Sequence, residues 1–110
     1  MEVHILDRKV GITQDQREII DRSIEFAFDR FSTHIRSVDA TFTDVNGPKG
    51  GEDIQCRMKI LLHGKGDIIV EGKGASVEAI VAQTTDRAAI AISRRIDRLQ
   101  DSQGTSMSGQ

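Results

Sequence analysis

The sequence is poor in cysteine, proline and large aromatics: its 110 residues include one cysteine, one proline, and no tryptophan or tyrosine. The lone Cys56 cannot form a disulfide within the chain, which fits a reducing compartment. Pro48 stands in the glycine-containing run 46–51, and this run predicts a turn because proline cannot donate to a β-ladder.

Signals for membranes and secretion are also missing. No apolar run approaches the ~20 residues that span a bilayer. The N-terminus has no basic segment followed by a long apolar stretch, as a signal peptide would. We therefore expect a cytoplasmic protein that makes no membrane contact.

An excess of charge of either sign is also missing, since the net charge is −2. A whole-molecule basic field is excluded, so any contact with nucleic acid must come from a local patch. The length predicts one folded domain, over residues 1–100. Residues 101–110 are mostly small and polar without periodicity, which predicts a disordered tail.

Hydrophobic periodicity predicts six elements. Apolar and polar residues alternate over 2–6, 38–43, 53–63 and 67–73, as in half-buried strands. Helical spacing appears over 14–32 and from Ser76 to Leu99. Thr13 and Gln16 have the spacing of a capping box before the first helix, and Ser76 can cap the second.

The order of these elements, β-α-β-β-β-α, predicts an α+β fold. A helix between the first two strands permits a parallel pair with a right-handed crossover. The short links between the last three strands predict an antiparallel meander. Both helices would then cover one face of a four-stranded mixed sheet, while the other face meets water.

The sequence offers little catalytic chemistry. Its three histidines lack metal-ligand spacing, and Cys56 falls on the apolar side of its strand, where a buried core thiol is expected. The glycines around Lys65 and Lys73 do not match a phosphate-binding loop. We therefore predict a protein that is not an enzyme, with no metal, cofactor or small-molecule substrate.

The best charge feature lies in the second helix. Arg87, Arg94 and Arg98 are spaced by seven and four, so they share one side of a helix, and Arg95 stands beside them. Four arginines against two aspartates give residues 86–99 a local charge of +2. Such a stripe can bind phosphates. The alternative is a solvated face whose cations interact favourably with the helix dipole near its C-terminus.

The first helix differs, with a net charge of −2 over residues 14–32. It carries Ile19 and Phe26 off its main apolar stripe, and Ile90 is placed similarly in the second helix. If exposed, these three side chains form a hydrophobic patch for a protein partner or a homodimer. If the helices are tilted, they are instead buried.

In its order of elements and in several of its residues, the chain resembles the ribosome hibernation-promoting factor and ribosome-associated inhibitor family, in its short single-domain form. The resemblance covers about residues 1–99. It rests on diffuse, ordered matches: Val10-Gly11-Ile12-Thr13, Arg17-Glu18, Phe31, Asp67-Ile68, Lys73-Gly74, Ala79 and Asp86-Arg87. The chain departs from its relatives at Ser23, Phe26 and Ile90, where basic residues are common.

The resemblance implies a fold like that of double-stranded-RNA-binding domains. It also implies binding to the small ribosomal subunit, where the protein would occlude the decoding region and modulate translation under stress. The side chains expected to hold ribosomal RNA phosphates are Arg8, Arg87, Arg94, Arg95 and Arg98. The competing hypothesis is a protein-interaction module that has lost ribosome binding and uses Ile19, Phe26 and Ile90.

Overall fold

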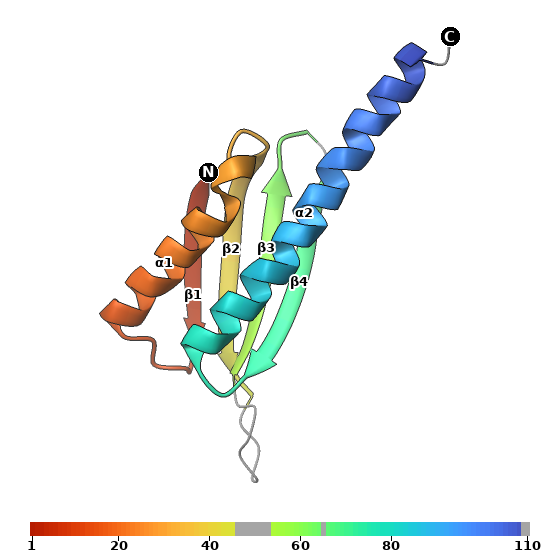
Figure 1. Cartoon of the computed structure of the whole chain (residues 1–110). Coiled ribbons are helices and arrows are strands. Elements are labelled where there is room, and N and C mark those ends of the chain that lie inside the picture. Colours follow the sequence, from red (N-terminus) through yellow and green to blue (C-terminus); the bar gives the residue numbers. More distant parts are fainter. Residues whose placement is uncertain (46–53, 65, 109–110) are drawn as a thin grey trace.

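The computed structural model describes the backbone of residues 1–45, 54–64 and 66–108, and the side chains of these segments as far as Arg98. The elements follow the predicted order (Figure 1). They are β1 (Glu2–Arg8), α1 (Gln14–Phe28), a 3-10 turn η1 (Asp29–Phe31), β2 (Ile35–Asp44), β3 (Ile54–Leu62), β4 (Asp67–Gly74) and α2 (Val77–Ser108).

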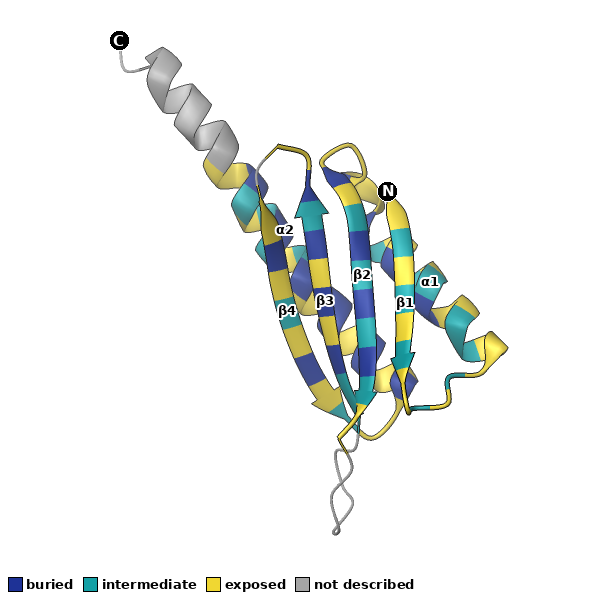
Figure 2. Ribbon diagram, turned by 180° about the vertical axis from the view of Figure 1, so that it is seen from behind, coloured by how far each residue is buried: buried dark blue, intermediate teal, exposed yellow. Residues whose placement is uncertain are grey.

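The four strands form one mixed sheet in the order β1-β2-β3-β4. β1 runs parallel to β2, and β2, β3 and β4 pair antiparallel. Both helices cover one face, and the opposite face is open, as Figure 2 shows from behind. The predicted α+β fold is therefore confirmed.

The core lies between the helices and the covered face of the sheet. The first helix contributes Ile20, Ile24 and Phe28, all fully buried. The strands contribute alternate residues, among them Phe42 and Cys56, which are also fully buried. Burial raises the pKa of the Cys56 thiol to about 12, as expected for a thiol that packs as a small apolar group.

The predicted helix caps are present. Thr13 Oγ1 accepts a hydrogen bond from the Gln16 backbone N–H at 3.1 Å, and Gln16 Oε1 accepts one from the Thr13 N–H at 3.0 Å. Ser76 Oγ accepts from the Ala79 N–H at 3.2 Å. Each bond satisfies a donor that a helix N-terminus leaves free.

The predicted end of the first helix, at residue 32, is wrong. The α-helix ends at Phe28 and tightens into η1. Phe31, the last residue of η1, is buried and belongs to the same core as Phe28. Sequence periodicity alone does not separate these two helix types.

The loop between β1 and α1 is folded around one carboxylate. Asp7 accepts hydrogen bonds from the backbone N–H groups of Ile12 (2.8 Å), Val10 (2.8 Å) and Gly11 (3.2 Å). These bonds, that from Ile12 above all, lower the pKa of Asp7. The loop needs left-handed backbone at Lys9 (φ 67°) and Gly11 (φ 80°), so the Asp7 contacts help to offset the strain at Lys9.

The second helix lies close against β4. At Gly72, an added Cβ would be 2.6 Å from Thr84 Oγ1. Glycine therefore permits the approach of helix and strand, and this approach sets where the outer side chains of α2 stand.

The end of α2 lies beyond the predicted domain limit, since the helix continues from Val77 to Ser108. Side chains after Arg98 lie outside the described part, so the domain limit at residue 100 and the disordered tail 101–110 stay predictions. The predicted turn at 46–51 also lies outside the described residues. No helix of the described chain is long and apolar enough to span a membrane.

Candidate nucleic-acid interface

Three arginines line the flank of α2 that faces the free edge of the sheet. Arg87, Arg94 and Arg98 are exposed, and the helical period places them on one side of α2. This side borders β4, because Arg87 reaches that strand. We call these three residues the α2 arginine flank.

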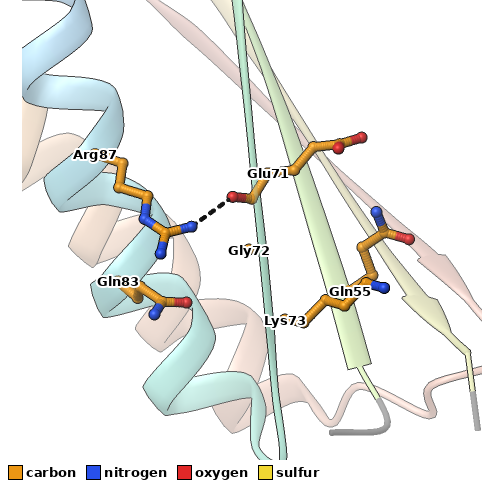
Figure 3. A pocket seen from close by; sticks show the side chains of 6 residues that line it. All are labelled: Gln55, Glu71, Gly72, Lys73, Gln83 and Arg87. Carbon is orange, nitrogen blue, oxygen red and sulfur yellow. Dashed lines mark hydrogen bonds between the residues drawn. The ribbon is translucent and has the colours of Figure 1, made fainter.

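The contact of Arg87 is seen in Figure 3. Its Nη1 donates to the backbone carbonyl of Glu71 at 3.0 Å. β4 is an edge strand, so its outward carbonyls are without a strand partner. The Arg87 guanidinium therefore makes one structural hydrogen bond and has further N–H donors. Arg87 lines a shallow hollow together with Gln83 and Lys73.

The other helix arginines differ in their surroundings. Within the described part of the chain, neither Arg94 nor Arg98 is recorded in an ion pair with an acidic group. Arg95 is half-buried and points less fully to solvent than its neighbours. Arg94 and Arg98 are thus exposed cations without an acidic partner among the described residues, about one helical turn apart.

The structure does not bring Arg8 together with the helix arginines. Residue 8 is the last of β1, and its side chain lines a hollow on the open sheet face with Thr43, Gln55 and Arg57. The helices cover the other face. The predicted RNA-binding set is therefore divided between two surfaces.

Sequence reasoning missed Arg57 and Lys73 as candidate site residues. The strand register places Gln55 beside both Thr43 and Lys73, so these residues extend the surface that begins at Arg8. The register between strands, which local patterns do not contain, was the missing signal.

The surface of α1 has the opposite electrostatic character. Repulsion by Asp21, together with a hydrogen bond between the two carboxyls, raises the pKa of Glu25. Two acids this near each other oppose the approach of a polyanion. A nucleic acid would therefore meet α2 from the side of β4 rather than from the side of α1.

The three off-stripe apolar side chains are exposed: Ile19 by 37%, Ile90 by 55% and Phe26 by 87%. Ile19 and Phe26 line one hollow on α1 together with Arg22 and Ser23. Ile90 stands on α2 and does not line that hollow. Two of the three predicted partner-binding residues thus form a common surface.

Among the described residues, no group of three or more histidine, cysteine or acidic side chains could hold a metal ion. The sites that the structure does offer are cationic or apolar surfaces.

Solved structures of other proteins share this fold, and two of them illustrate the likeness. The first is the N-terminal domain of Protein Y from Thermus thermophilus, with 17% identity, a TM-score of 0.69, and coverage of 86% of this chain and 98% of that chain. The second is a ribosomal subunit interface protein from Coxiella burnetii, with 13% identity, a TM-score of 0.74, and coverage of 88% and 99%. No family model matches the chain, and no curated protein matches it significantly.

These comparisons establish the class by fold. The chain is an α+β domain with the architecture of the Protein Y N-terminal domain over most of its length. The fold implied by the resemblance in the sequence is confirmed. At these identities the likeness concerns the fold, and function is argued separately from the surfaces.

Proposed function

We propose that this protein is a cytoplasmic, non-enzymatic stress or hibernation factor that binds the small ribosomal subunit. It would occlude the decoding region and so modulate translation. The main observation behind this proposal is the α2 arginine flank, on a fold shared with a ribosomal subunit interface protein. The mechanism is steric, and it requires a rigid cationic surface rather than a reactive group.

Phosphate binding by α2 rests on the exposure of Arg94 and Arg98. Their guanidinium groups are unpaired among the described residues, so phosphate binding breaks no ion pair within that part of the chain. Arginine can bind phosphate oxygens through two parallel N–H groups. Arg87 lies about 10 Å farther along the axis, so the flank can contact more than one phosphate.

The test is co-sedimentation with purified small subunits over a salt series. We expect Arg94→Gln/Arg98→Gln to weaken binding and to reduce the slope of log affinity against log salt by about 1.4 to 1.8. Asp97→Asn on the same helix is the matched control, and it should leave binding equal or tighter because it removes a negative charge. Unchanged binding and slope in the double variant would reject the assignment.

A second function is favoured by one observation, the 87% exposure of Phe26. A protein-interaction module, either a homodimer or a binder of another protein, would cover Phe26 and Ile19. Light scattering after size-exclusion chromatography separates the two proposals. A stable dimer that Phe26→Ser converts to monomer, and that does not sediment with ribosomes, favours the module.

A further inference from the structure

The open face of the sheet carries a transverse row of polar and basic side chains. Arg8 pairs with Thr43, Thr43 with Gln55, and Gln55 with Lys73. Every second residue of a strand points to the same face, so these four side chains cross the sheet from edge to edge. They stand on the face that the helices leave open (Figure 2).

The neighbouring row adds a third cation. Arg57 pairs with Glu71 across the strands, and its Nε lies 3.8 Å from a carboxylate oxygen of Glu71. Both side chains are more than half exposed, so this ion pair is weak. We call Arg8, Arg57 and Lys73, with Thr43 and Gln55, the basic sheet end.

Two hollows meet on this surface. One, of about 240 Å³, lies on the open face and is lined by Arg8 and Arg57. The other, of about 430 Å³, passes the edge of β4 and is lined by Lys73 and Arg87. Both are also lined by Gln55 and Glu71, and Glu71 is the one acid among the described lining residues.

The charges of the sheet face are segregated along the strands. At the opposite end, Lys59 Nζ lies 3.6 Å from Asp67 Oδ2, and His4 Nε2 lies 3.3 Å from a carboxylate oxygen of Glu2. Within the described residues, Arg8 and Lys73 have no such acidic partner. Among the described residues, acids therefore offset the cations at one end of the face, whereas the other end has an excess of positive charge.

The spacing of the cations defines the ligand. Arg8 is on β1 and Lys73 on β4, three strand intervals apart, or about 14 Å. Side chains that stand roughly perpendicular to the sheet at this separation are spaced for more than one phosphate group. We propose that the basic sheet end binds an extended chain of phosphate groups, and that it does so independently of Arg94 and Arg98. Thr43 and Gln55 supply neutral hydrogen-bond donors between the cations.

Two sources share this chemistry: the backbone of a single-stranded RNA and inorganic polyphosphate. The probe is a fluorescent RNA of about 15 nucleotides, measured by anisotropy, with polyphosphate and ATP as competitors. We expect Arg8→Gln/Lys73→Gln to weaken binding about tenfold at low salt and to reduce the salt slope by about 1.5. Glu71→Gln should tighten binding, a gain that partial unfolding cannot imitate.

Amide chemical shifts of the ¹⁵N-labelled protein show where on the protein the RNA binds. RNA should shift the amides of Thr43 and Gln55 in the native chain and in Arg94→Gln/Arg98→Gln, which separates this site from ribosome binding through α2. Lys59→Gln, from the end of the same face where acids offset the cations, is the matched control and should change affinity less than twofold.

Competition between RNA, polyphosphate and ATP tests which ligand chemistry the site recognises. Displacement of RNA by polyphosphate but not by ATP supports a site for a phosphate chain of either origin. RNA binding that resists polyphosphate would mean that bases or sugars carry the recognition, and it would overturn a site for a phosphate chain. The proposal is overturned if ATP competes as well as the chains, if RNA does not bind, or if Lys59→Gln weakens binding as much as Arg8→Gln/Lys73→Gln.

Discussion

Gly72 fixes the distance between α2 and the sheet, and Gly72→Ala tests this directly. The new Cβ would lie 2.6 Å from Thr84 Oγ1 and 3.1 Å from Gln83 Oε1. The exposed Gln83 can move aside. Thr84 is fully buried, so either its side chain or the whole helix must shift.

The magnitude follows from two opposing effects. Overpacking a filled core costs about 1–3 kcal/mol. Alanine also restricts the unfolded chain, which returns about 0.4–1 kcal/mol. We expect a net loss of about 1–2 kcal/mol in the free energy of unfolding, and a fall in Tm of about 4–16 °C for a domain of this size. Urea denaturation and thermal circular dichroism measure both quantities.

A second substitution shows whether the contact with Thr84 is the cause. Among the described residues, Thr84 Oγ1 makes no hydrogen bond to nitrogen or oxygen, and only the Cys56 thiol interacts with it. Thr84→Ala therefore removes the obstacle at the cost of one weak thiol contact. Gly72→Ala/Thr84→Ala should be more stable than the sum of the single changes predicts, by about 1 kcal/mol. If the two costs simply add, close packing at Gly72 is not what positions the helix.

The remaining predictions concern two titratable groups in the domain. The Asp7 pKa is lower in the folded chain, chiefly through the Ile12 N–H, so its stabilising effect is full above its unfolded pKa. That effect is lost as the pH falls through the folded pKa. Asp7→Asn should therefore lower Tm at pH 7 and flatten the loss of stability below about pH 4; an equally steep acid transition would contradict this role. The Cys56 thiol, with its pKa near 12 and no exposure, should react with Ellman's reagent only upon unfolding, and rapid labelling of the native chain would show that the core opens.

Local chemistry made much of the fold predictable. The Thr13 capping box depends on residues three apart, and the alternation around Cys56 and Met58 depends on a period of two. Both signals lie within a few residues of chain, so the sequence contains them in full. The parallel pairing of β1 with β2 followed from the intervening helix and the known handedness of such crossovers.

The site was less predictable because it depends on contacts distant in sequence. The alternating pattern predicts a first strand that ends at residue 6, so it does not assign Arg8 to a face of the sheet. Lys73 joins Gln55 through a register that the β3–β4 turn sets. The bond from Arg87 to Glu71 depends on how near α2 comes to β4, which no helical period specifies.

The most direct measurement is a titration of the native, N-terminally labelled protein into purified small and large ribosomal subunits at two salt concentrations. The account predicts saturable binding to the small subunit that weakens steeply as salt rises, with little binding to the large one. Absence of binding to small subunits at low salt, or equal affinity for both subunits, would contradict it.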